Sequence, residues 1–190
     1  MTNIKNESPE KGKEKQALVE LAKYSRKTLK PYVKDGRFTV RFPEKIERDF
    51  DCSRLGLETL EGCPKIVGRN FICSKNKLTS LEGAPKEVGS DFNCSFNNLT
   101  SLIGSPEAVG SNFDCSNNEL ASLEGAPKKV GGDFDCSNNE LASLSGSPEV
   151  VGGSFDCSNN ELASLKGAPK KVGSNFNCSN NELASLEGSP

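Results

Sequence analysis

The stretch "FDCSNNELASL" occupies residues 113–123 and returns without change at 134–144 and 155–165. A fourth copy at 176–186 differs only in having Asn177 where the others have aspartate. A catalytic site is built once, from unlike residues. Verbatim repetition at a constant interval therefore predicts a scaffold or a binding surface, made of stacked copies of one small unit.

The repeat extends well beyond these copies. Phenylalanine recurs at the same interval from Phe50 to Phe176, cysteine follows two positions later, and a recurring pattern of one asparagine and two leucines comes next. Because side chains alternate across a strand, each phenylalanine and cysteine should point inward from one short strand. A Gly-x-Pro-x-x-Val-Gly segment then breaks the strand, so we expect an irregular return segment.

A unit as short as the one from Phe113 to Asp133 cannot bury its apolar side chains alone, so the units should stack into a solenoid with a parallel sheet on one side. The asparagine should form a buried ladder that bonds backbone groups left unpaired by the turns. In one complete unit the predicted interior residues are Phe134, Cys136, Asn139, Leu141 and Leu144.

The string Phe-x-Cys-Ser-x-Asn-x-Leu-x-Ser-Leu resembles the core of leucine-rich repeats over about residues 43–190. The short period and the proline resemble the bacterial short class known from secreted effectors, and the Val-Gly-x-x-Phe variant resembles repeat proteins encoded by bacteriophages. The resemblance implies a concave face that holds a protein partner. Two departures stand out: glycines from Gly68 to Gly173 replace the family's first leucine, and Leu55 replaces the first asparagine.

Three segments are predicted along the chain: a disordered polar tail at 1–15, a helix–strand cap at 16–42, and the solenoid at 43–190, with seven units of which the last is incomplete. The cap helix should run from 16 to about 30 and end before Pro31. After a turn at Asp35-Gly36, the strand "RFTVRF" should point alternate residues inward. The inward residues are Leu18, Leu21, Ala22, Ser25 and Leu29 in the helix, and Phe38, Val40 and Phe42 in the strand.

Charge is unevenly distributed along the chain. Residues 1–49 carry 13 basic and 8 acidic side chains, whereas residues 50–190 carry 11 and 18. The two parts should therefore meet different partners. The basic residues interleave with glutamates, so a solvated cap is expected rather than a nucleic-acid site. With no apolar run of membrane length and no apolar segment typical of a signal peptide, the sequence predicts a cytoplasmic protein without membrane association.

The outward strand positions are the candidate binding face. They vary in chemistry up to Phe96 and are then uniform and acidic. A specific partner needs unlike contacts, and aromatic and arginine side chains supply much of the energy of protein interfaces. The predicted partner-binding residues are Arg54, Arg69, Ile72, Lys75 and Phe96, with a secondary acidic face of Asp114, Asp133, Asp135 and Asp156. Two alternatives stay open for the acidic columns: a merely solvated sheet face, or a ladder that binds calcium.

Catalysis and cofactors are not expected. The chain has no histidine, which excludes serine–histidine and cysteine–histidine nucleophiles, and it has no phosphate-binding loop. The acidic pair Asp133 and Asp135 recurs down the chain, as a solvated strand face would. The eight cysteines lack the close spacing of metal sites, and the seven that follow a phenylalanine should form a reduced, buried ladder. Cys63, which lies outside that ladder, is predicted to be exposed.

These observations favour a non-enzymatic, protein-binding solenoid. The resemblance implies a phage-encoded or effector-like inhibitor or modulator of a host protein. The alternative is a structural protein that self-assembles end to end by stacking through an uncapped C-terminal coil.

Overall fold

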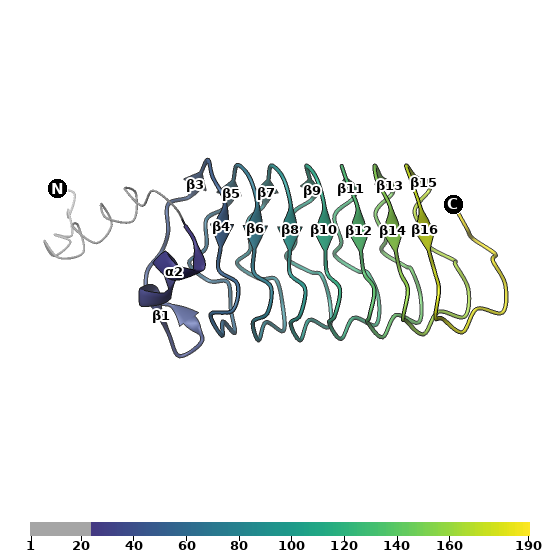
Figure 1. Ribbon diagram of the computed structural model, residues 1–190, viewed down its shortest axis with the longest axis horizontal. Coiled ribbons are helices and arrows are strands. Elements are labelled where there is room, and N and C mark those ends of the chain that lie inside the picture. Colours follow the sequence, from purple (N-terminus) through teal and green to yellow (C-terminus); the bar gives the residue numbers. More distant parts are fainter. Residues whose placement is uncertain (1–23) are drawn as a thin grey trace, which may run out of the picture.

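The computed structural model describes residues 24–190, which form a parallel β-solenoid of about six turns with little helix. The coils follow one another along a straight axis (Figure 1), so the face that the resemblance predicts as concave is a flat side of the solenoid. The ~21-residue period of the sequence is thus one turn of the structure. No helix among the described residues is long and apolar enough to cross a membrane.

The predicted strand forms one seven-stranded parallel sheet, which we call the Phe sheet. In each strand the phenylalanine faces the interior and pairs in register with the phenylalanine of the next coil. The ring centroids lie 5.1–5.9 Å apart, slightly more than the spacing of adjacent strands, and five of the six pairs are stacked. The strands are β4 (Phe50–Asp51), β6 (Phe71–Ile72), β8 (Phe92–Asn93), β10 (Phe113–Asp114), β12 (Phe134–Asp135), β14 (Phe155–Asp156) and β16 (Phe176–Asn177).

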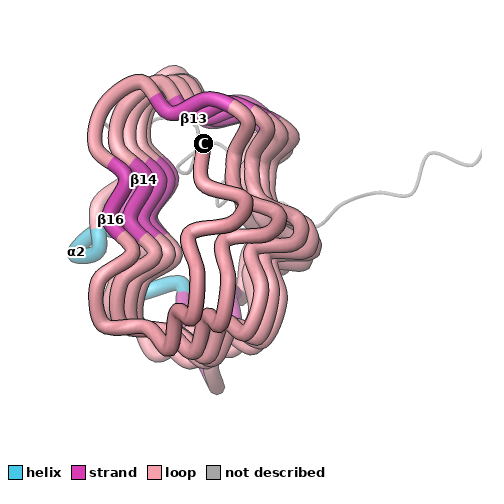
Figure 2. Tube along the Cα trace, turned by 90° about the vertical axis from the view of Figure 1, so that its right-hand side faces the viewer, coloured by secondary structure: helices cyan, strands magenta, loops and turns pink. Residues whose placement is uncertain are grey.

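The return segment contains a second parallel sheet that the sequence analysis did not predict. Its strands are very short, and in each the second residue, a valine in all but the first, faces inward. We call it the Val sheet; it lies on an adjacent side of the coil (Figure 2). The strands are β3 (Lys45–Ile46), β5 (Ile66–Val67), β7 (Glu87–Val88), β9 (Ala108–Val109), β11 (Lys129–Val130), β13 (Val150–Val151) and β15 (Lys171–Val172).

A glycine forms the corner between the two sheets, at the position where the resemblance expects leucine. A Cβ atom on Gly131 would overlap the carbonyl oxygen of Gly110, its counterpart in the preceding coil. The corner therefore requires glycine because neighbouring backbones approach closely there. This close approach explains the departure from the leucine-rich pattern.

The interior holds the predicted residues. Phe134, Cys136, Leu141 and Leu144 are fully buried, and Asn139 is half-buried. Their counterparts in the preceding and following coils are buried in the same way. The core is therefore a set of parallel columns that runs the length of the solenoid.

The asparagine column joins each coil to the one before it. Asn118 donates from Nδ2 to the carbonyl oxygens of Cys94 in the preceding coil and Cys115 in its own, at 3.2 and 3.0 Å. Its Oδ1 accepts the backbone N–H of Leu99, also in the preceding coil, at 3.1 Å. In the first unit Leu55 replaces asparagine, and its backbone N–H donates to Oδ1 of Asn76 in the second unit.

The N-terminal cap covers the open side of the first coil. It contains helix α2 (Arg26–Leu29), the 3-10 turn η1 (Lys30–Tyr32) and the hairpin strands β1 (Val33–Lys34) and β2 (Arg37–Phe38). The hairpin turns at Asp35 and Gly36, both with positive φ, as the sequence predicts. Phe38 and Phe42 are buried and pack edge to face, with ring centroids 5.0 Å apart.

The predicted continuous cap helix is wrong within the described residues. Tyr24 forms a parallel bridge with Phe50, and Ser25 is extended, so α2 begins only at Arg26. Pairing of Tyr24 with the first strand competes with helix formation there. Of the predicted inward residues, Leu29 is buried and Ser25 is not in the helix, while Leu18, Leu21 and Ala22 lie outside the described residues, as does the predicted tail.

Candidate functional face

The residue directly after each phenylalanine points outward from the Phe sheet, and in six of the seven units it is aspartate or asparagine. In those six units its Oδ1 accepts the backbone N–H of the serine two positions later, at 2.9–3.2 Å. Such a bond stabilises the turn that ends the strand. Ile72 is the exception, because its side chain has no acceptor, so the second unit lacks this bond.

A second outward column lies four positions after each phenylalanine, and its backbone is left-handed in all seven units, with φ of 54–57°. Asparagine tolerates this conformation and occupies the position in the last four units. The first three units instead place Arg54, Lys75 and Phe96 there. For such side chains the left-handed conformation costs roughly 1–2 kcal/mol per residue.

A third column, two positions before each phenylalanine, also changes character along the solenoid. It holds Arg48 and Arg69 in the first two units and only serine or glycine afterwards. Arg69 is exposed. All five predicted binding residues therefore lie on the Phe-sheet side near the cap, and four of them replace a residue that would stabilise the turn better. We call this part of the Phe-sheet side, residues 48–96, the variable end.

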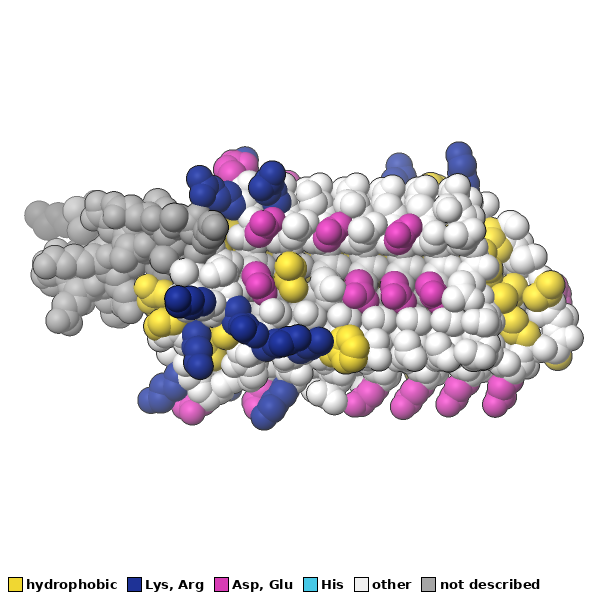
Figure 3. Space-filling model, viewed as in Figure 1, with side chains coloured by type: hydrophobic (Ala, Val, Ile, Leu, Met, Phe, Trp, Pro, Cys, Tyr) yellow, Lys and Arg dark blue, Asp and Glu magenta, His cyan; other side chains and the backbone are white. Residues whose placement is uncertain are grey.

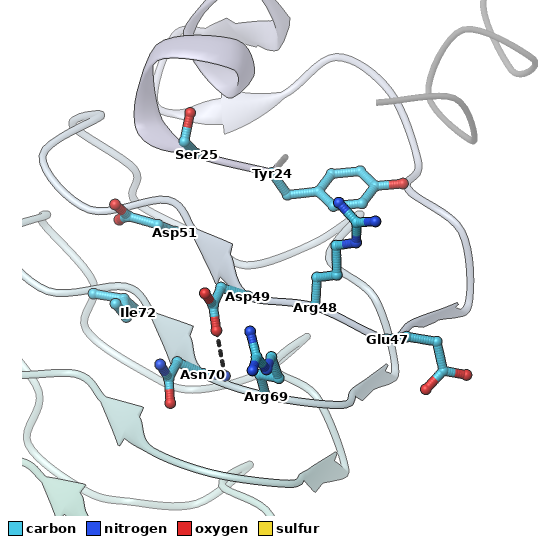
Figure 4. A pocket seen from close by; sticks show the side chains of 9 residues that line it. All are labelled: Tyr24, Ser25, Glu47, Arg48, Asp49, Asp51, Arg69, Asn70 and Ile72. Atoms are coloured by element: carbon cyan, nitrogen blue, oxygen red, sulfur yellow. Dashed lines mark hydrogen bonds between the residues drawn. The ribbon is translucent and has the colours of Figure 1, made fainter. Parts of the chain in front are cut away.

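Arg69 and Ile72 line a hollow of about 700 Å³ beside the cap. Figure 4 shows Arg48 rising toward the ring of Tyr24, and Arg69 of the neighbouring coil lying beside Asp49. Asp49 accepts the backbone N–H of Asn70 at 3.1 Å, so this carboxylate also joins the first two coils. The remaining lining residues are Ser25, Glu47 and Asp51.

Arg54, Lys75 and Phe96 line a second, adjoining hollow of about 610 Å³, which shares Ser25 and Asp51 with the first. The Lys75 ammonium lies 4.9 Å from the centre of the Phe96 ring, a cation–π contact. Phe96 is 49% exposed although it is a large apolar side chain. Figure 3 shows basic side chains gathered at this end of the face, and acidic side chains in rows that begin there and continue along the face without them.

The acidic residues after Phe113 form regular columns, which we call the uniform end. Asp114, Asp135 and Asp156 are partners in the strand register, so their carboxylates follow one another at about 4.8 Å. Burial raises the pKa of Asp135 above its ordinary value, and the neighbouring charges of Asp114 and Asp156 raise it further, while bonds from Ser137 oppose the shift. Asp133 is exposed and accepts the N–H of Ser154 at 2.7 Å. These carboxylates therefore each stabilise the backbone.

The cysteines behave as buried apolar side chains. All eight are free, and those of the column from Cys52 to Cys157 are buried. Burial raises the pKa of the Cys136 thiol well above its usual range and that of Cys157 to about 12, which disfavours the reactive thiolate. Within residues 24–190, no three carboxylate, thiol or imidazole side chains converge as a metal site would require.

The predicted exposure of Cys63 is wrong. Its side chain is only 4% exposed. The cap segment covers this position, since Phe42 donates its N–H to the carbonyl of the adjacent Gly62 at 2.9 Å. The predicted burial of Cys178 is also only partial, because its side chain is half-buried.

The sequence analysis missed the contribution of the cap to this face. Tyr24 lines the first hollow, and Arg26 and Lys27 line the second. The excess of basic residues in 1–49 was a signal that this part of the chain contributes to binding. The bridge between Tyr24 and Phe50 is what places the cap beside the first strands, and no local sequence pattern indicates that bridge.

No protein-family model, curated protein or solved structure shows significant similarity to this chain. The repeat is seen in the sequence of this chain, and the solenoid is seen in its structure. A functional assignment must therefore rest on the chemistry of its surfaces.

Proposed function

We propose that this chain is a non-enzymatic, protein-binding solenoid of the leucine-rich-repeat type, and that the variable end holds the partner. The observation that carries the proposal is the set of residues at Arg54, Ile72, Lys75 and Phe96. At each of these positions the last four units use an aspartate or asparagine that suits the turn. Locally unfavourable residues gathered on one exposed face are typical of functional sites.

The surface chemistry supports the same proposal. The variable end offers cationic, aromatic and aliphatic side chains around two adjoining hollows, which is the mixture found at energetically important interface positions. The uniform end offers identical polar units whose carboxylates already bond the backbone. The resemblance to bacterial and phage repeat proteins favours a role as an inhibitor or modulator of a host protein.

Replacing the four residues by those of the later units tests the proposal. The variant R54N/I72D/K75N/F96N makes the variable end like the rest of the solenoid and should fold at least as stably as the wild type. Affinity capture from host-cell extract, quantified by mass spectrometry, should lose the specific partner with this variant. The matched control D114N/D135N/D156N should retain it. Equal capture by both variants would show that the variable end is not the binding face.

Self-assembly is the second candidate, and one observation favours it. In the last coil Phe176 and Leu183 are only half-buried and Leu186 is 66% exposed, whereas their counterparts in inner coils are buried. Apolar side chains exposed together on one face favour association. Light scattering over a range of protein concentrations tests this candidate: growth in mass supports assembly, and a constant monomer mass contradicts it.

A further inference from the structure

The hollow beside Phe96 carries an excess of positive charge that the described residues do not balance. Arg26 and Lys27 come from α2, and Arg54 and Lys75 come from the Phe-sheet side. None of these four cations forms a salt bridge within residues 24–190. The two carboxylates of the lining, Asp51 and Asp114, already accept bonds from Ser53 and Ser116.

The position of the cap gives this hollow an end wall. In Figure 2, α2 projects outward beyond the strands of the Phe sheet. Arg26 and Lys27 therefore face the same space as Arg54 and Lys75 from a different side. Toward the other end of the face the columns become acidic from Asp114 onward, and they would repel an anion (Figure 3). An anionic ligand is thus attracted to one end of the face only.

The apolar part of the hollow limits the kind of anion. Phe96 is half exposed with Lys75 over its ring, and Ile72 lies half-buried in the adjoining hollow. A peptide can place an apolar side chain on Phe96 and a carboxylate near each cation. A nucleic-acid backbone carries a charge at every step and would also meet Asp51 and Asp114. The lining therefore favours a polypeptide.

We propose that this hollow binds an acidic, extended segment of the partner protein, with an aromatic or aliphatic side chain of that segment packed on Phe96. The inference rests on the proposed function and adds to it the chemistry of the partner. Carboxylates of the segment pair with Arg54 and Lys75 on the sheet side and with Arg26 and Lys27 on the cap. The acidic columns beyond Asp114 fix the position of the segment along the solenoid.

A library of random dodecapeptides displayed on phage is the probe for this inference. Selection on the full chain should enrich peptides that are net negative and contain an aromatic residue or leucine. A synthetic copy of the most enriched peptide should bind at least tenfold more weakly to R54N/K75N, and R26Q/K27Q should weaken it by severalfold. Replacing every Glu and Asp of the peptide by Gln and Asn should have the same effect as R54N/K75N, and added salt should weaken binding.

The outcomes separate this inference from the proposed function. Enriched peptides that are neutral or basic but lose binding to I72D/F96N would overturn the acidic segment and leave the variable end as a binding face. Peptides that bind I72D/F96N and R54N/K75N with the same affinity as the wild type would contradict both proposals. No enrichment, or tighter binding of a single-stranded DNA dodecamer than of any peptide, would overturn the acidic segment.

Discussion

The first three coils and the last four have the same interior and different surfaces. Phe71 and Phe134 are equally buried, and Asn97 and Asn118 make the same set of bonds to the coils before them. On the outer side, however, Lys75 and Phe96 occupy a left-handed position that Asn138 fills later. The left-handed position therefore holds a residue that suits its backbone in the last four coils, whereas in the first three it holds residues that this backbone does not favour.

The largest expected effect concerns the interior that the two parts share. Replacing Asn76 or Asn139 by alanine leaves buried backbone groups of two coils without their partner, and each substitution should lower the free energy of unfolding by about 2–4 kcal/mol. Urea unfolding measures both. A small effect at Asn76 and a large one at Asn139 would show that the interiors of the two parts are not equivalent.

The cysteine column gives the next largest effect. Cys94 and Cys136 each donate a weak bond to the carbonyl of the next strand, Asp114 and Asp156 respectively, at 3.4 and 3.2 Å. The shorter side chain of serine draws the hydroxyl away from that carbonyl, so C94S and C136S should each cost about 1–3 kcal/mol, measured by thermal unfolding. The costs should agree with one another, because the column is the same in both parts.

Thiol labelling under native conditions checks the same burial without a substitution. Cys178, which is half-buried, should react fastest, and the seven buried thiols, Cys63 included, should react only after local opening. Rapid modification of Cys63 by a small thiol reagent would contradict its position under the cap.

The left-handed column gives a smaller effect of opposite sign. K75N should raise the free energy of unfolding by about 1 kcal/mol, because asparagine tolerates the backbone that lysine does not, and N138K should lower it by the same amount. Equilibrium unfolding of the two single variants is the measurement. If K75N is destabilising, the lysine must be stabilised by contacts that outweigh its backbone.

The smallest expected effect lies at the uniform end. The pKa of Asp135 is raised in the folded chain, so its contribution to stability is fully present below its ordinary pKa and is lost as the pH rises through the folded value. D135N removes that loss and keeps an oxygen acceptor for Ser137. The variant should be more stable at pH 7 by less than about 1 kcal/mol, and no more stable at pH 3. A gain that persists at pH 3 would show that charge is not the cause.

Strict periodicity made much of the fold predictable. The inward phenylalanine and cysteine and the asparagine ladder follow from their constant spacing along the chain, because only stacked coils bury such short units. The Val sheet was missed because strands as short as Lys129–Val130 leave no alternation to detect. The burial of Cys63 and the approach of Arg26 to the face depend on how the cap folds over the first coil, which only tertiary contacts determine.

The asparagine ladder has a consequence for how such a chain can lengthen. Each asparagine bonds the coil before it as well as its own, so a unit inserted in register brings the side chain that secures its predecessor. A tandem duplication of the gene segment that encodes one unit would therefore add one complete coil without any compensating change elsewhere. Copies produced in this way begin identical, and the stretches at 113–123, 134–144 and 155–165 still are. Each copy supplies new surface positions on which binding specificity can evolve.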